Sequence, residues 1–221
     1  CVEEVSNHTL MMILNSAKKF NQLEANVKKG LWGDFAIAKP IHAVRGQTLG
    51  LLGCGRIARC LAVKAQVFGI KVIAYDPYIK PEAIKDFGVT LVSREELLAQ
   101  SDFISMHLLL NEDTRKSINA DFFKKMKNSA IFVNTARGGL VDEDALIEAL
   151  RTGEIAGAAL DVLTEEGIDK DAPLQKFDNV IITPHAAWYS EQAFYTLLTS
   201  AAQEIVRALH GEPVKNQVNH F

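Results

Sequence analysis

The sequence has only three cysteines, Cys1, Cys54 and Cys60, and they form neither a CxxC pair nor a cysteine–histidine cluster. So sparse and odd-numbered a set argues against a disulfide framework and against a zinc site, and no metal is expected. It favours a reducing compartment, so we expect a cytoplasmic protein. The first residues also lack the basic and apolar segments of a secretory signal peptide.

Long hydrophobic runs and clusters of one charge sign are absent as well. No apolar run approaches the ~20 residues that a membrane-spanning helix needs. The 221 residues are 48% hydrophobic and 23% charged, as in ordinary globular proteins, with a formal net charge of −3. Because the basic side chains are scattered, we expect no nucleic acid and no membrane among the partners, which leaves small molecules or other proteins.

Short apolar runs alternate with helical patterns through the middle of the chain. The strand candidates are TLGLL, KVIAY, VTLV, DFISM, AIFV, IAGAAL and VIIT. Helices are expected near Ile57–Phe68, Pro81–Phe87, Arg94–Ala99, Asn119–Lys125 and Asp142–Thr152. Because the strand runs are continuously apolar and do not alternate, they predict strands buried on both faces. The expected fold class is therefore α/β, a doubly wound parallel sheet with helices on both faces.

Helical patterns also stand at both ends of the chain. Apolar residues at helical spacing predict one amphipathic helix from Val5 to about Lys28 and a last helix from about Ser190 to His210. The polar stretch Thr164–Asp178 predicts a long loop, and loops of this length are more often functional than idle.

Two of the expected helices begin with capping signals. Ser93 followed by Glu96 predicts a capping box. Asp142 is expected to accept hydrogen bonds from the first-turn amides of the helix that follows it.

A glycine fingerprint follows the first strand candidate. TLGLL runs directly into Gly53-Cys54-Gly55-Arg56-Ile57-Ala58, a G-x-G-x-x-A pattern that opens a helix. Gly53 permits the tight turn, Gly55 lets the backbone approach a pyrophosphate, and the helix N-terminus supplies amides and partial positive charge. Alone, such a triplet can also be a mere tight turn.

The next strand candidate ends in Asp76, which strengthens the nucleotide interpretation. A carboxylate there can accept both ribose hydroxyls of an adenosine, and it would repel a 2′-phosphate. The alternative is a solvated carboxylate that begins a turn with Pro77. With strand, glycine turn, helix and second strand in this order, we predict a Rossmann domain that binds NAD. Its first contacts are expected at Gly53, Gly55, Arg56, Ile57 and Asp76.

Arg137 lies just beyond a buried strand candidate and precedes two glycines. In a doubly wound sheet, ligands bind at the carboxyl ends of the strands. A guanidinium there could fork onto a substrate carboxylate and polarise the adjacent carbonyl. The alternative is a structural ion pair with Asp142 or Glu143.

Asp161 and His185 also follow strand candidates directly. Asp161 could orient a nicotinamide carboxamide, and Glu165 and Glu166 follow it in the long loop. If Glu166 reaches His185, the carboxylate favours the protonated imidazole, which can then give a proton to a carbonyl oxygen during reduction. By contrast, His8, His210 and His220 are expected on helix or tail surfaces.

In this order the motifs resemble the D-isomer-specific 2-hydroxyacid dehydrogenases. The similarity covers nearly the whole chain and is carried by GLLGCGRIA, YDPY, SDFISMHL, NTARGGLVDEDAL, GAALDV and TPHAAW. NTARGGLVDEDAL and TPHAAWYSEQA are most similar to the branch that contains the C-terminal binding protein corepressors and bacterial relatives called phosphoglycerate dehydrogenases.

The resemblance implies roles for individual residues. Arg137 is the substrate anchor, His185 the acid/base, and Glu166 its partner in preference to Glu165. Trp188 lies beside the substrate side chain, although packing against the last helix is an equal alternative. Contacts to the cofactor are implied for His107, Thr135, Ala136, Arg137, Asp161 and His185.

The resemblance also implies a division of the chain. Relatives carry an N-terminal substrate lobe before the long helix, and this lobe is expected to be largely missing. Residues 1–28 would then connect the lobes, 29–189 form the dinucleotide-binding domain, and 190–221 form the returning helix and tail of the substrate lobe. The connecting helix pairs subunits in the family, so a homodimer is expected.

Two classes of function remain open at this point. The favoured one is an NAD-dependent enzyme that interconverts a small 2-oxo acid and a (D)-2-hydroxy acid. The other is an NAD(H)-sensing, corepressor-like binding protein in which turnover is incidental. An intact Arg137, Glu166 and His185 set fits both. If Trp188 lines the pocket, substrates with apolar side chains should be preferred.

Overall fold

The computed structural model describes residues 1–33, 35–167 and 169–215. Within them, seven parallel strands form one sheet in the order β3-β2-β1-β4-β5-β6-β7. The strands are β1 (Thr48–Leu52), β2 (Lys71–Tyr75), β3 (Thr90–Leu91), β4 (Phe103–Met106), β5 (Ile131–Asn134), β6 (Gly157–Leu160) and β7 (Val180–Ile182). Six of the strands lie within the apolar runs, and β5 extends one residue past AIFV to Asn134. The predicted doubly wound Rossmann sheet is confirmed.

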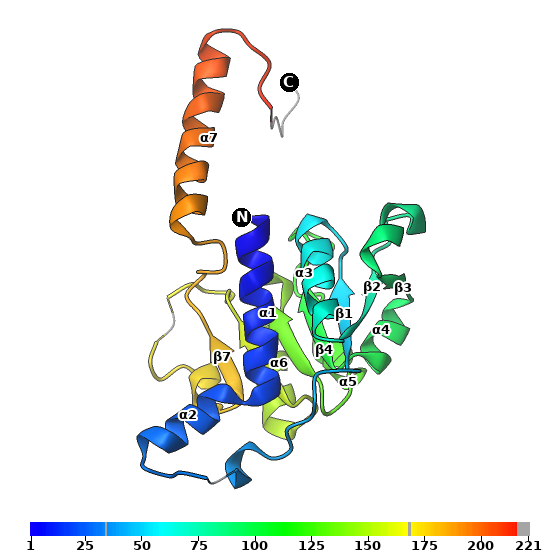
Figure 1. Ribbon diagram of the computed structural model, residues 1–221, viewed down its shortest axis with the longest axis vertical. Helices are drawn as coiled ribbons and strands as arrows, with labels where there is room; N and C mark the ends of the chain where they lie inside the picture. The colour runs from blue at the N-terminus through cyan, green and yellow to red at the C-terminus, as the bar shows by residue number, and fades with distance from the viewer. Residues whose placement is uncertain (34, 168, 216–221) are drawn as a thin grey trace.

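Helices cover both faces of this sheet (Figure 1). They are α1 (Val2–Lys18), α2 (Phe20–Lys28), α3 (Arg56–Val67), α4 (Arg94–Gln100), α5 (Ala120–Lys124), α6 (Glu143–Thr152) and α7 (Glu191–Leu209). One apolar cluster joins α1 and α3 to one face, and a second joins α4, α5 and α6 to the other. The order of the strands reverses between β1 and β4, and such a switch point is where open α/β sheets bind their ligands.

The prediction of a single helix from Val5 to Lys28 is wrong. Lys19 adopts a left-handed conformation with φ 49°, which ends α1 and starts α2. After this turn α2 runs toward the segment that precedes β7, where the Gln22 side chain donates a hydrogen bond to the Asp178 carbonyl. Apolar spacing continues on both sides of Lys19, so the periodicity does not reveal a break of one residue.

Two further local predictions need correction, and one is confirmed. Ser93 and Glu96 form the expected capping box. Asp142 occupies the N-cap of α6, but its side chain accepts no cap hydrogen bond and lies 3.9 Å from the Lys116 ammonium. The helix expected over Pro81–Phe87 is instead two short 3₁₀ helices that meet at Ile84.

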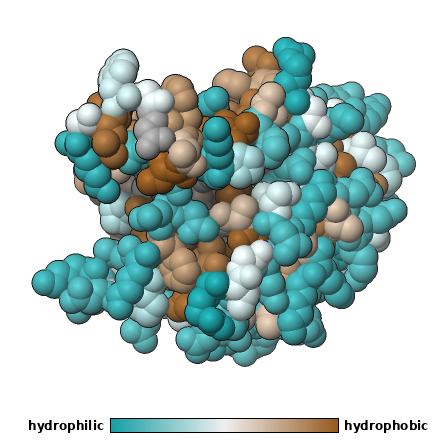
Figure 2. Space-filling view, turned by 90° about the horizontal axis from the view of Figure 1, so that it is seen from below, coloured by the Kyte–Doolittle hydropathy of each residue, from teal (hydrophilic) through white to brown (hydrophobic). Residues whose placement is uncertain are grey.

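The last helix, α7, begins where predicted and projects away from the sheet (Figure 1). It leaves several apolar side chains in solvent, Leu197, Leu198, Ile205, Val206 and Leu209. At the opposite end of the molecule, hydrophobic residues interrupt a largely hydrophilic face (Figure 2). None of the helices in the described parts of the chain is long and apolar enough to cross a membrane.

Candidate active site

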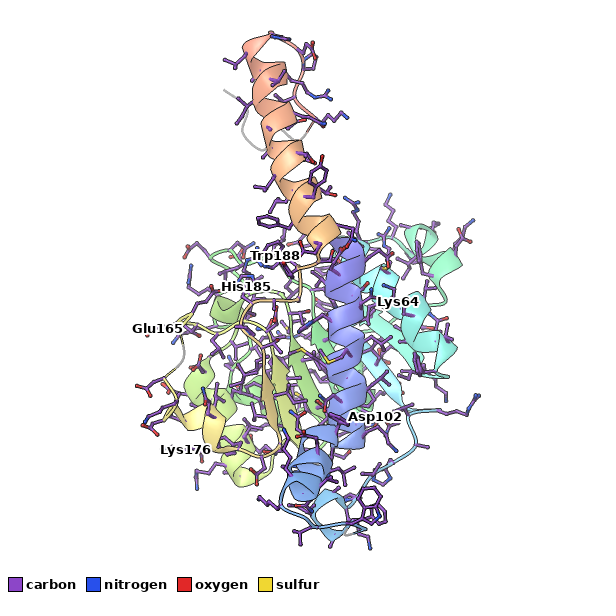
Figure 3. All side chains as sticks on the ribbon, turned by 60° about the vertical axis from the view of Figure 1, so that its left-hand side comes forward. Lys64, Asp102, Glu165, Lys176, His185 and Trp188 are labelled. Carbon is purple, nitrogen blue, oxygen red and sulfur yellow. The ribbon has the colours of Figure 1, made fainter. Side chains whose placement is uncertain are left out.

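The predicted site residues gather at the carboxyl ends of the strands. Figure 3 shows His185 and Trp188 at the end of the sheet where α1 begins, whereas Asp102, which precedes β4, lies at the other end. The parallel arrangement produces this gathering because every strand that runs in the same direction ends at the same edge.

The glycine loop between β1 and α3 has the geometry of a phosphate cradle. Gly53 has φ +88°, and a Cβ there would lie 2.7 Å from the His107 carbonyl oxygen, so a larger residue does not fit. A Cβ on Gly55 would meet no atom within 4 Å, which leaves open space over the loop. Gly55 is the N-cap of α3 and supplies no side-chain cap, so the first amides of the helix can donate hydrogen bonds to an anion. Arg56 and Ile57 begin this same helix.

Asp76 lies beside this loop at the end of β2. Its Oδ2 accepts a hydrogen bond from the Cys54 amide at 2.8 Å, and its Oδ1 accepts one from the Tyr78 amide at 2.9 Å. These bonds fix the half-buried carboxylate next to the cradle, where an adenosine ribose attached to a pyrophosphate would extend. The loop and Asp76 therefore fit a dinucleotide.

His107 follows β4 and lies against Gly53. Its Nε2 is 3.0 Å from the Ser105 hydroxyl oxygen. Burial lowers the pKa of the His107 imidazole from 6.5 to about 4, because the protonated ring would lose its hydration there. The ring is therefore neutral near pH 7.

This burial predicts a pH-dependent stability. Below pH 6.5 the unfolded chain binds a proton that folded His107 takes up only near pH 4, so the free energy of unfolding falls as the pH drops through this window. The expected loss is up to about 3 kcal/mol. Denaturant titrations at pH 7 and 4.5 should show a smaller loss in His107→Gln than in the wild type. If both proteins lost the same free energy of unfolding between the two pH values, burial of His107 would not be the cause.

A turn after β5 presents Arg137. The buried Asn134 side chain accepts a hydrogen bond from the Ala136 amide and donates one to the Arg137 carbonyl, both at 3.0 Å. The exposed guanidinium donates to the Ala136 carbonyl oxygen, and among the described residues no carboxylate pairs with it. Asp142 is near Lys116, and Glu143 accepts from the Thr164 amide. The structural ion pair considered above is therefore not formed.

His185 and Glu166 come together although they lie in different loops. The Nδ1 atom of His185 is 2.6 Å from Glu166 Oε1, and both side chains are partly exposed. Because Nδ1 makes this contact, Nε2 of the imidazole has no hydrogen-bond partner among the described residues and can face a ligand. Glu165 lies apart from His185 (Figure 3). The histidine itself has a left-handed backbone with φ 53°, which is costly for a residue with a side chain and needs support from its surroundings.

Asp161 supplies that support. Its side chain is 1% exposed, and its two oxygens accept the amides of Ala186 and Ala187, each at 2.9 Å. The Asp161 carbonyl also accepts the His185 amide at 2.8 Å. The structure thus gives Asp161 a role as the anchor of the His185 loop, and its contact with a nicotinamide stays a prediction.

Trp188 packs on its neighbours in the same loop and on α7. Its ring meets Tyr189 edge to face at 5.5 Å and lies 6.4 Å from the Phe194 ring. This is the packing alternative named above. The half-buried indole is still only three positions from His185, so a contact with a substrate side chain stays a prediction.

A cavity of about 470 Å³ adjoins the His185–Glu166 pair. Its size falls in the range of small-molecule pockets. Its apolar lining comes from β7 and from the segment just after β6, namely Val162, Leu163, Val180 and Ile182. Asp161, Glu166 and His185 also line the cavity, whereas Arg137 and Asp76 are not part of its lining.

Sequence reasoning missed the contribution of α1. His8 was expected on the surface of its helix, but only 18% of its side chain is exposed, and its Nε2 lies 2.9 Å from the Thr183 hydroxyl oxygen. The neighbouring Thr9 contacts the Thr135 hydroxyl at 2.8 Å. The signal was present, because helical spacing places His8 on the same stripe as Val5 and Met12. Of the other surface histidines, His210 is exposed, and His220 lies outside the described residues.

Comparison with known proteins agrees with this geometry. Residues 10–187 match the family model described as D-isomer specific 2-hydroxyacid dehydrogenase, NAD binding domain. The chain is 43% identical over 216 residues to a D-3-phosphoglycerate dehydrogenase of Methanocaldococcus jannaschii, and 39% identical to that of Archaeoglobus fulgidus. These matches cover 97% of this chain but only 41% and 40% of the relatives.

A solved structure resembles the chain as well. The D-lactate dehydrogenase of Aquifex aeolicus, complexed with NAD and lactic acid, superposes with a TM-score of 0.89 at 33% identity. The match covers 96% of this chain and 68% of that protein. The chain belongs to the D-isomer specific 2-hydroxyacid dehydrogenase family and contains its NAD-binding domain.

Proposed function

We propose that this protein is an NAD-dependent oxidoreductase that interconverts a 2-oxo acid and a (D)-2-hydroxy acid. The observation that carries the proposal is the 2.6 Å contact between His185 and Glu166 at the strand ends of a dinucleotide-binding sheet. The D-lactate dehydrogenase structure with NAD and lactic acid supports it, because it shares this fold over nearly all of the chain.

The chain's own residues divide the chemistry between them. Arg137, without a carboxylate partner in the described residues, binds the substrate carboxylate through its planar fork. His185 gives a proton from Nε2 to the carbonyl oxygen during reduction and takes it back during oxidation. Glu166 accepts the Nδ1–H hydrogen bond, which sets the ring orientation and balances the imidazolium charge.

The cofactor site uses the other half of the same sheet edge. Gly53, Gly55, Arg56 and Ile57 would hold the pyrophosphate, and Asp76 would hold the adenosine ribose. When bound, NADH supplies a hydride to the carbonyl carbon of the substrate. We assign His107, Thr135, Ala136 and Asp161, which follow β4, β5 and β6, to contacts with the same cofactor.

Asp76→Ala should change the cofactor preference. Removal of the carboxylate loses a hydrogen-bond acceptor for the ribose of NAD and at the same time relieves repulsion of a 2′-phosphate. We expect the affinity for NADH to fall about 10-fold to 100-fold, and that for NADPH to fall less or to rise. Fluorescence titrations of both cofactors measure this, with the exposed Asp86→Ala as control. An unchanged ratio of the two affinities would remove Asp76 from ribose recognition.

A substrate screen tests the reaction itself. Purified full-length protein with NADH should reduce at least one 2-oxo acid among glyoxylate, pyruvate, hydroxypyruvate, 3-phosphohydroxypyruvate and longer apolar 2-oxo acids. The aromatic cluster of Trp188, Tyr189 and Phe194 supports a preference for apolar side chains. A preference for the phosphorylated substrate would contradict the proposed preference for apolar side chains. NADH binding without turnover of any of these 2-oxo acids would contradict the proposed enzymatic activity.

The same proposal includes a homodimer as the working state. α1 presents its outer face, including Met11, which is 43% exposed, and nearby α3 exposes Val63 and Val67. Light scattering coupled to gel filtration of the full-length protein measures the assembly. A monomer at micromolar concentration would overturn this part of the proposal and leave the chemistry untouched.

A further inference from the structure

A partly buried chain of hydrogen bonds runs from α1 to the loop that carries His185. His8 Nε2 lies 2.9 Å from Thr183 Oγ1, and Thr183 in turn hydrogen-bonds Asp161 Oδ1. Asp161 then holds the amides of Ala186 and Ala187, which directly follow His185.

The donors along this chain can be assigned from chemistry. An ionised carboxylate only accepts hydrogen bonds, so the single hydroxyl proton of Thr183 points to Asp161. The His8 contact must therefore be a bond donated by the ring to the Thr183 oxygen, which fixes the Nε2–H tautomer of His8. The same Nε2 lies 3.5 Å from Asp161 Oδ1, so the donor also faces the carboxylate directly.

The hydrogen bonds from Asp161 lie next to a strained part of the backbone. His185 has φ 53°, a left-handed conformation that a side chain makes unfavourable. The carboxylate of Asp161 opposes that cost through the two amides on the C-terminal side of His185. Any shift of Asp161 would therefore displace the imidazole.

We propose that His8 is a positioning residue for the reaction, which sets the place of the His185 imidazole through Thr183 and Asp161. The proposal rests on the proposed function for its kinetic part. Thr9, the next residue of α1, makes the corresponding contact to Thr135, next to the turn that presents Arg137. Two adjacent residues of one helix thus hold both loops of the predicted catalytic site.

Kinetics of the full-length protein give the first test. His8→Ala should lower kcat about 10-fold to 100-fold, because a misplacement of the acid by about 1 Å costs this much, while the Kd for NADH changes little. His8→Gln places an amide donor near Nε2 and should recover most of the activity. His42→Ala, which removes an exposed histidine outside the helices, is the matched control.

Thr183→Val interrupts the same chain of hydrogen bonds at its next member and keeps the shape of the side chain. It should lower kcat as His8→Ala does, and the double variant should be no worse than either single one. Additive losses would show that the two residues act separately, and would overturn the proposed route. A loss of activity in His8→Gln as large as in His8→Ala would overturn it too, since a donor alone should restore the chain.

Hydrogen exchange gives a readout that needs no turnover. The amides of Ala186 and Ala187 bond to Asp161, so they should exchange about tenfold faster in His8→Ala and at the wild-type rate in His8→Gln. Unchanged exchange in His8→Ala would overturn the proposal even if kcat fell. If the wild type reduces no 2-oxo acid, the proposed function fails, and the exchange rates still decide whether His8 holds the loop. Should His8→Ala not fold, Thr183→Val carries the same comparison.

Discussion

Substitution of His185 should lower kcat by about 10²–10⁴-fold and leave the affinity for NADH nearly unchanged. The imidazole is the only group in the proposed mechanism that transfers a proton, and its Nδ1 is already bonded to Glu166. Stopped-flow measurement of NADH oxidation in the full-length protein, together with NADH titration, separates the two effects.

The choice of substitution matters because His185 has φ 53°. Asparagine tolerates this left-handed conformation far better than alanine, so His185→Asn removes the acid and keeps the backbone. His185→Ala and His185→Asn should lose activity to a similar extent. If His185→Asn turned over normally and only His185→Ala were slow, the effect would come from the backbone, and the acid/base role would be wrong. His210→Asn, at an exposed histidine, is the control.

Substitution of Arg137 should lower kcat/KM for the 2-oxo acid by about 10²–10³-fold in Arg137→Ala. Arg137→Lys should recover only a small part, because an ammonium cannot form two parallel bonds to a carboxylate. The guanidinium is exposed and makes its hydrogen bond to a neighbouring carbonyl, so its removal should hardly change the thermal midpoint.

The exposure of Arg137 also permits chemical rescue. Added guanidinium ions should restore part of the activity of Arg137→Ala, whereas they should not affect Arg137→Lys. Arg151→Ala, which breaks an exposed ion pair with Glu148, is the matched control and should retain wild-type kinetics. A fall in thermal midpoint that paralleled the fall in activity would point to a structural role for Arg137.

The sequence predicted those parts of the fold that depend on local patterns. The apolar runs located all seven strands, because burial on both faces of a parallel sheet favours apolar residues, and only Asn134 at the end of β5 lies outside them. The capping box at Ser93 was equally readable. The turn at Lys19 and the bare N-cap at Asp142 were not, since each depends on where the chain goes next and not on its own residues.

The candidate site shows the same division. Strand ends indicated Arg137, Asp161 and His185, but no spacing could reveal that Glu166 reaches the imidazole, and the family resemblance suggested it. Helical spacing places His8 on the inward stripe of its helix, but its partner Thr183 follows a strand far along the chain. Periodicity can therefore predict that His8 is covered, whereas the identity of its partner depends on the assembled fold.

The position of α1 has a consequence for how the protein is made. The helix precedes β1 in the chain, yet it packs against β5 and β6, and His8 bonds to a residue 175 positions later. A ribosome therefore releases α1 long before the part of its face that packs on β5 and β6 can be covered. Contacts so distant in sequence form slowly, and until then the apolar face of α1 is open to chaperones and to other chains. The loop that carries His185 consequently gains its support only after β7 has been synthesised and has met α1.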